Sequence, residues 1–167
     1  MLRSGVIALC ILLSACSATG PTYSSLDSSP RRLAAQNVEL VVYRPSSFAL
    51  MARAPDVEIN GVNTCELSNG SFFTREIELR SVAITASLWD MPGTSRLSFK
   101  PQAGKRYFVR VSTDGGKLTA GVIGGYIGLA IAEGASSRGG PFVIDLLDEQ
   151  AALPELQPLK MSTACRQ

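Results

Sequence analysis

The sequence predicts a mainly β protein, a small antiparallel β-sandwich with one short helix near its C-terminal end. Apolar and polar residues alternate with a period of two in at least five segments between positions 38 and 111. Turn residues, chiefly Gly, Asn, Asp and Pro, separate these segments at intervals of about ten residues. Short alternating strands at this spacing are typical of sandwiches, in which each strand turns one face to the core.

The first strands are expected around two Asn-Gly dipeptides. Residues 38–42 alternate and predict the first strand. Asn60-Gly61 and Asn69-Gly70 favour two-residue hairpin turns, because both residue types accept the positive φ angles that such turns require. We therefore expect a hairpin at each of the two positions.

The second half of the chain continues the pattern and ends in a helix. Strands are expected over residues 82–88, 97–99, 107–111 and 141–147. A short helix is expected over 148–156, with acidic residues in its first turn, where they face the positive end of the helix dipole.

Residues 118–132 are the one segment that does not fit this pattern, since they contain no charge. Gly124, Gly128 and Ala132 recur at four-residue spacing, which lets helices approach closely in membranes. A membrane span needs about 20 apolar residues, and this segment is shorter. Two interpretations stay open: a buried strand hairpin or core segment, and a helix that touches a membrane or oligomerises.

Residues 1–15 are expected to be a secretory signal peptide. Arg3 gives the N-terminus a positive charge, residues 5–13 are uninterruptedly apolar, and small residues follow. The apolar run is too short to remain in the membrane as a spanning helix.

The end of this segment resembles the lipobox of bacterial lipoproteins. The matching residues are Leu13, Ser14 and Ala15, followed by Cys16. The resemblance implies that the signal is cut before Cys16, whose sulfur takes a diacylglycerol and whose amino group takes a further acyl chain such as palmitate. Ser17 in the next position implies sorting to the outer membrane, most simply with the protein facing the periplasm.

Residues 16–36 are expected to be the lipidated cysteine and a flexible tether, and residues 37–167 the folded domain. The tether sequence is rich in Ser, Pro and Thr and has little periodic apolar content. A flexible chain of this length spans about 25 Å on average. The domain is therefore expected to hang clear of the lipid headgroups.

The four cysteines separate by position. Cys10 leaves with the signal peptide and Cys16 is used by the lipid, which leaves Cys65 and Cys165 in an oxidising compartment. We favour a disulfide that pins the C-terminal tail to the first hairpin, the alternative being two unrelated thiols. The sequence has no CxxC motif and no histidine, so its spacing predicts no zinc site.

Several motifs resemble a bacterial lipoprotein family known as domain of unknown function 2846. The motifs are Tyr43-Arg44-Pro45, VEING at 57–61, Asn69-Gly70-Ser71-Phe72, VAI at 82–84, and Ala103-Gly104-Lys105 before YFVR at 107–110. The layout is also similar to PEGA-type surface modules. The resemblance implies a small periplasmic sandwich with no assigned activity. At the level of fold alone, the chain is similar to small transthyretin-like lipoproteins that anchor secretion assemblies.

The sequence argues against catalysis and against nucleic-acid binding. It contains no histidine, the usual general base, and neither a nucleophile motif nor a phosphate-binding loop. The net charge of +2 gives no basic footprint for nucleic acid. We expect no cofactor and no metal.

The expected function is that of a non-catalytic binding or scaffolding module held at the envelope by its lipid. Its partner is expected to be an envelope protein. The contact surface is expected at an edge strand or in the loops 46–55 and 89–94, where Phe48, Met51, Trp89 and Met91 interrupt polar sequence. The alternative for these loops is that they fold back onto the core. Alternative functions are a membrane-active or oligomerising lipoprotein that uses residues 118–132, and a small lipoprotein anchor of a secretion assembly.

Overall fold

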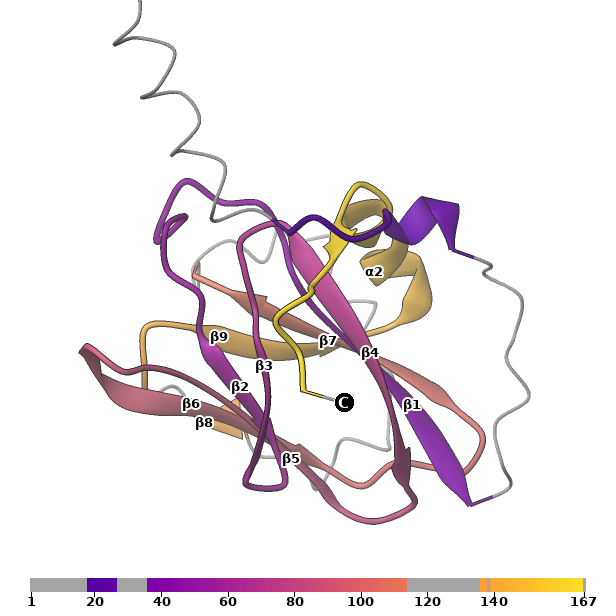
Figure 1. Cartoon of the computed structure of the whole chain (residues 1–167). Helices are drawn as coiled ribbons and strands as arrows, with labels where there is room; N and C mark the ends of the chain where they lie inside the picture. The colour runs from indigo at the N-terminus through magenta and orange to yellow at the C-terminus, as the bar shows by residue number, and fades with distance from the viewer. Residues whose placement is uncertain (1–17, 27–35, 114–135, 138, 167) are drawn as a thin grey trace, which may run out of the picture.

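The structure is a computed structural model that describes residues 18–26, 36–113, 136–137 and 139–166. Within these residues the chain forms a β-sandwich of two five-stranded sheets, with a single α-helix outside one of them (Figure 1). The uncharged segment 118–132 and Cys16, the expected site of lipidation, lie outside the described residues.

The first sheet is mixed in strand direction. Its order is β10-β4-β1-β7-β9. β1 pairs antiparallel with β4 but parallel with β7, and the short β10 also runs parallel to β4. The strands are β1 (Asn37–Arg44), β4 (Ser71–Glu78), β7 (Arg106–Ser112), β9 (Val143–Leu147) and β10 (Lys160–Met161).

The second sheet is antiparallel throughout its described strands. Its order is β3-β2-β5-β6-β8. The strands are β2 (Asp56–Ile59), β3 (Val62–Glu66), β5 (Val82–Leu88), β6 (Met91–Phe99) and β8 (Ser136–Ser137).

The main core lies between the two sheets. Alternate residues of β1, such as Val38, Leu40 and Val42, face alternate residues of β5, such as Val82 and Ile84. All five side chains are buried. Period-two alternation gives this arrangement directly, because successive side chains of a strand point to opposite faces.

A second core covers the other face of the first sheet. Val41 and Tyr43 of β1 pack there with Phe108 of β7 and with Leu156 of helix α2 (Glu149–Leu156). Asp148 caps the N-terminus of the helix, since its Oδ1 accepts the backbone N–H of Ala151 at 2.7 Å. β1 is therefore buried on both faces, and its polar exposed face, expected from alternation, does not exist.

Residues 18–26 pack on this second core. Their 3₁₀ turn η2 (Tyr23–Ser25) places the ring of Tyr23 edge-on to Phe72, with centroids 5.2 Å apart. The backbone N–H of Gly20 and that of Tyr23 donate to the carbonyls of Met161 and Leu159. The tether expected over residues 16–36 thus contains a docked segment at 18–26, while residues 27–35 lie outside the described residues.

The C-terminal tail joins the edges of the two sheets. Ser162 donates its backbone N–H to Phe72 in β4, and Arg166 donates its own to Thr64 in β3. In Figure 1 this yellow segment runs between β3 and β4. The Sγ atoms of Cys65 in β3 and Cys165 in the tail are 1.99 Å apart, at disulfide distance, as the sequence predicts.

The prediction of a mainly β sandwich with a short C-terminal helix is confirmed, and two details differ. Asn60-Gly61 forms the expected hairpin turn, with φ angles of 53° and 80°. Asn69-Gly70 does not form a hairpin, because β3 and β4 belong to different sheets and the dipeptide carries the chain from one to the other. β1 pairs parallel with β7, and between these two strands the chain crosses to the second sheet and back twice.

Candidate functional site

Two loops that are far apart in sequence meet at one end of the sandwich. The register pairs Asp56, the first residue of β2, with Ser87 near the end of β5. The loop before β2 and the turn after β5 therefore lie side by side. An ion pair between Arg53 and Asp90 joins them. We call residues 46–55 and 89–94 together the loop surface.

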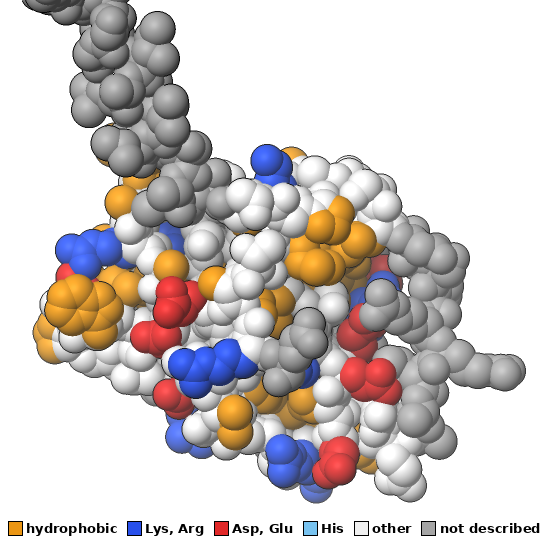
Figure 2. All heavy atoms as spheres, viewed as in Figure 1, with side chains coloured by type: hydrophobic (Ala, Val, Ile, Leu, Met, Phe, Trp, Pro, Cys, Tyr) orange, Lys and Arg blue, Asp and Glu red, His pale blue; other side chains and the backbone are white. Residues whose placement is uncertain are grey.

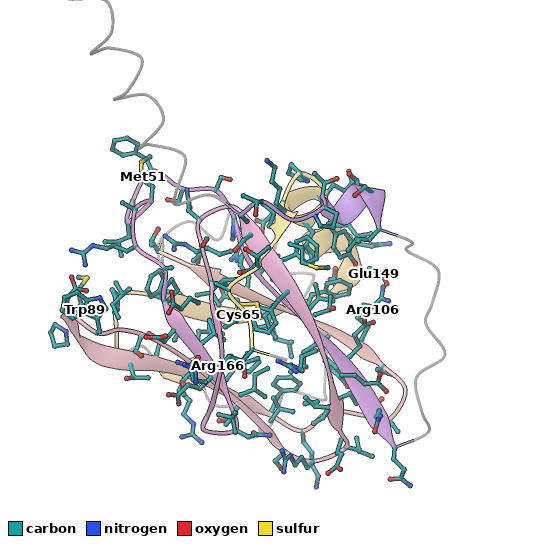
Figure 3. All side chains as sticks on the ribbon, viewed as in Figure 1. Met51, Cys65, Trp89, Arg106, Glu149 and Arg166 are labelled. Atoms are coloured by element: carbon teal, nitrogen blue, oxygen red, sulfur yellow. A yellow bond between two sulfur atoms is a disulfide. The ribbon has the colours of Figure 1, made fainter. Side chains whose placement is uncertain are left out.

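The loop surface carries four exposed apolar side chains. Phe48 is 91% exposed and Trp89 is 88% exposed, while Met51 and Met91 are 51% and 38% exposed. Figure 2 shows apolar side chains at the left edge of the molecule, and Figure 3 shows Met51 and Trp89 on that side, away from Arg106 and Glu149. None of the four belongs to either core.

Trp89 is exposed because it occupies a tight turn. Leu88 pairs with Met91 across the β5–β6 ladder, which leaves Trp89 and Asp90 as the two residues of the turn. Gly93 follows with a φ of 92°, and a Cβ there would lie 1.7 Å from the carbonyl oxygen of Gly139. The absence of a side chain at Gly93 thus lets the backbone of residue 139 pack closely against this side of the loop surface.

A buried arginine fixes the other side. Arg44 is 1% exposed and extends beneath the loop 46–55. Its Nη2 donates to the carbonyl of Leu50 at 2.7 Å, and its Nη1 donates to the carbonyls of Leu67 and Arg53. The guanidinium carbon lies 5.3 Å from the centre of the Phe142 ring. Leu50, with a φ of 53°, turns inward and packs against the main core.

The guanidinium of Arg44 makes its bonds to backbone and not to a carboxylate. The ion pairs found among the described residues involve Arg53, Arg106 and Arg110. Burial lowers the pKa of Arg44 to about 10, so the side chain still carries its charge at neutral pH. Arg44 is thus a positioning residue for the loop that carries Phe48.

A small hollow lies between this loop and the N-terminal segment. Ala18, Met51, Arg53, Glu66 and Ser162 are among its lining residues, and its volume is about 270 Å³. Ala18 is 7% exposed. The first described residue of the chain is therefore seated beside the loop surface.

A polar network lies on the helix side of the first sheet. Arg110 donates to Asp145 at 3.0 Å and to Glu155 at 3.1 Å, and the hydroxyl of Tyr43 donates to Glu155 at 2.9 Å. Burial, reinforced by the charge of Glu155, raises the pKa of Tyr43. Burial alone would lower the pKa of Arg110, but the hydrogen bond to Asp145 and the negative charges of Glu155 and Asp145 together outweigh burial and raise it. These contacts tie α2 to β7 and β9.

The outer face of the second sheet is polar and hollowed. A cavity of about 700 Å³ there is lined by Glu58, Asn60, Thr85, Arg96 and Lys100, among others. Neither this cavity nor the loop surface contains a set of metal ligands: the described residues hold no group of three His, Cys, Asp or Glu side chains placed to bind a metal ion. In the described part of the chain, no helix has the length and apolar character to cross a bilayer.

The comparison with protein families decides the family. The model of the family described as "Protein of unknown function (DUF2846)" matches residues 34–125. The chain belongs to this DUF2846 family. The match includes β1 to β7 and the whole loop surface, and it leaves out β9, α2 and the C-terminal tail. Searches of curated proteins and of solved structures find no match.

The sequence identified the exposed residues of the site but missed what holds them. Phe48, Met51, Trp89 and Met91 were expected as contact residues, and the structure brings their two loops to one end. In the sequence, Arg44 stands out only as part of the family motif Tyr43-Arg44-Pro45. Its signal was its position in the alternation of β1, two residues after Val42, which points it into the core.

Proposed function

We propose that this DUF2846 protein is a periplasmic lipoprotein anchored in the outer membrane through Cys16. It acts as a binding or scaffolding module, without catalysis, and holds an envelope component, such as an envelope protein, at the membrane. The loop surface is one of the surfaces through which it makes contact.

One observation carries the proposal. Four apolar side chains on two separate loops gather at one end, and the fold holds them outward with a buried arginine, a positive-φ leucine and an ion pair. Burying a charge costs the folded state free energy, and here the buried arginine orients a loop that exposes apolar side chains to solvent. Apolar side chains exposed in this way favour a contact role. The anchor is supported by the signal-like residues 1–15 and the lipobox that ends at Cys16.

The anchor is tested by changing Cys16→Ala. This variant should accumulate as an uncleaved precursor and take up no labelled palmitate in growing cells. Normal processing of the variant would refute the lipoprotein assignment.

The contact role is tested by photocrosslinking in intact cells. A photoreactive amino acid at position 48 should give adducts of the mature protein. The matched control is position 62, because Val62 is also strongly exposed but follows the turn at the opposite end of β2. Equal adduct yields at the two positions would mean that the loop surface has no special contact role.

A further inference from the structure

We infer that the loop surface rests on the headgroup region of the bilayer that holds the lipid of Cys16. This inference rests on the anchor proposed above and names the occupant of the loop surface.

The distance from the lipid to the folded domain is short. Ala18 is buried, and Gly20 donates its backbone N–H to Met161 at 3.2 Å. Residues 18–26 are therefore attached to the domain. Cys16 precedes Ala18 by two residues, and two residues of fully extended chain span about 7 Å. A lipid on Cys16 thus holds the domain directly at the membrane and not at the end of a 25 Å tether.

The point of attachment determines which side faces the membrane. Ala18 lines the same hollow as Met51 and Arg53, both of which belong to the loop surface. The side of the domain next to the lipid is therefore the side that presents Phe48 and Trp89. Arg106 and Glu149, on the other side of the molecule in Figure 3, face away from this end.

The chemistry of this side matches a membrane interface. Tryptophan is enriched at the level of the lipid headgroups. Moving exposed phenylalanine and methionine side chains from water into the acyl boundary lowers the free energy. Arg53 lies beside them in an ion pair with Asp90, so the acidic residue of the Trp89 turn brings no unpaired negative charge toward the lipid phosphates. A lipid chain and four apolar side chains then act together on one bilayer, where the lipid supplies high local concentration and the side chains supply orientation.

The single tryptophan of the sequence provides the test. The mature lipidated protein is reconstituted into vesicles of phosphatidylethanolamine and phosphatidylglycerol, with or without phospholipid brominated near the headgroup. Bromine should lower Trp89 fluorescence about twofold and the emission should shift to shorter wavelength, because an indole at headgroup level contacts the bromines. Acrylamide in the water should quench it less in vesicles than in detergent.

The matched control moves the tryptophan to the other end of β2. The variant Trp89→Phe/Val62→Trp has its only indole at a position that is also exposed in the wild type, at 64% for Val62. Bromolipid should leave its fluorescence unchanged. Equal bromolipid quenching of both proteins would overturn the proposed orientation.

The outcomes separate this inference from the anchor. Mass spectrometry of the reconstituted protein first establishes the acyl chains on Cys16, and a mass without them would refute the anchor and the inference together. A correct mass with Trp89 open to acrylamide and untouched by bromolipid overturns the inference alone. Shielding of Trp89 from both quenchers, with photocrosslinks from position 48 to a protein or to a second copy, would assign the loop surface to a protein interface and also overturn it.

Discussion

Arg44 and Phe48 lie four residues apart and have different roles in the loop surface. Arg44 positions the loop, and Phe48 is the side chain that the loop exposes. The first is buried with its charge and bonds to three backbone carbonyls, while the second stands in water. A buried charge needs hydrogen bonds because desolvation costs several kcal/mol. An exposed phenylalanine costs the folded state little, since it is equally exposed in the unfolded chain.

Arg44 can be tested by the substitution Arg44→Met. Methionine fills part of the space but leaves the carbonyls of Arg53 and Leu67 without the donor that Arg44 supplies, while the carbonyl of Leu50 keeps the backbone N–H of Arg53. We expect the free energy of unfolding to fall by about 3 kcal/mol, since each unsatisfied buried carbonyl costs about 1–3 kcal/mol. Urea denaturation of the purified protein measures the change. The Arg44→Lys variant keeps the charge but not the forked geometry of the guanidinium. Its free energy of unfolding should lie between those of the wild type and of Arg44→Met.

Phe48 should behave in the opposite way. Phe48→Ser is expected to change the free energy of unfolding by less than about 0.5 kcal/mol, as surface substitutions commonly do. Phe142→Ala, at a ring that is 1% exposed, should cost about 3–5 kcal/mol. Thermal unfolding of both variants compares them. A strongly destabilised Phe48→Ser would place this ring in the core.

At the scale of the element, the contacts that matter join segments distant in sequence. Helix α2 reaches β1 through Glu155 and Tyr43, which are 112 residues apart. The tail reaches β3 through Cys165. Of these two contacts, only the disulfide also restricts the unfolded chain, because a covalent link that closes a long loop removes chain entropy.

The disulfide should be formed in the mature protein. Thiol labelling should find Cys65 and Cys165 blocked until a reductant is added. A bridge across a sequence separation of 100 residues contributes at most about 4.7 kcal/mol in the chain-entropy model. We therefore expect reduction to lower the midpoint of urea unfolding markedly. Labelling of both thiols without reductant would contradict the bridge.

The contact of α2 with β1 makes a prediction about pH. The pKa of Tyr43 is raised above its usual value near 10, so the folded state holds this proton more tightly than the unfolded state. Its contribution to stability is complete below pH 10 and is lost as the pH rises above 10. Tyr43→Phe should remove this decline and, by removing the bond to Glu155, lower stability at pH 7 by about 1 kcal/mol. Denaturation at pH 7 and above pH 10 measures both effects.

At the scale of the whole molecule, both ends of the described chain lie together. Residues 20–23 run along residues 159–161, which in turn run along the start of β4. Gly20 permits this because a Cβ there would lie 2.5 Å from the carbonyl oxygen of Met161. The docking of the N-terminal segment thus depends on the absence of a side chain at position 20.

Gly20→Val should release the N-terminal segment from the domain. The added side chain meets backbone that cannot move without disturbing β10, so we expect cleavage by added protease within residues 18–26 to become faster. Mass spectrometry of the fragments identifies the cut. The neighbouring variant Thr19→Val, at an exposed residue, is the control and should be cut at the wild-type rate. Equal rates for both variants would mean that the docking does not depend on Gly20.

Local patterns predicted the strands better than their arrangement. The alternation of Val82, Ile84 and Ala86 gave β5 correctly, because one face of β5 is buried and the other is not. β1 alternates less clearly and is buried on both sides, since α2 and residues 18–26 cover the face that alternation assigns to water. Nothing local in Ser, Pro and Thr-rich sequence indicates that it will dock against a tail more than 130 positions away.

The loop surface shows the same difference between what local sequence predicts and what long-range contacts decide. Exposed Phe48 and Trp89 were expected because apolar residues in turn-rich sequence stand out. The ion pair of Arg53 with Asp90 was not, because its two residues are 37 positions apart and meet only through the register of β2 with β5. The β1 alternation pointed Arg44 inward, but only the structure shows the carbonyls that it meets.

The docking of residues 20–23 on the C-terminal tail has a mechanical consequence. If the chain is anchored at Cys16, any pull between membrane and domain enters at Ala18 and loads the hydrogen bonds to Leu159 and Met161 first. Those residues are tied covalently, through Cys165, to β3 in the opposite sheet. A tail held only by hydrogen bonds would peel away one bond at a time, whereas the disulfide passes the tension to both sheets at once. In the oxidised protein the tail should therefore stay on both sheets under a load from the anchor that would peel the tail from the reduced protein.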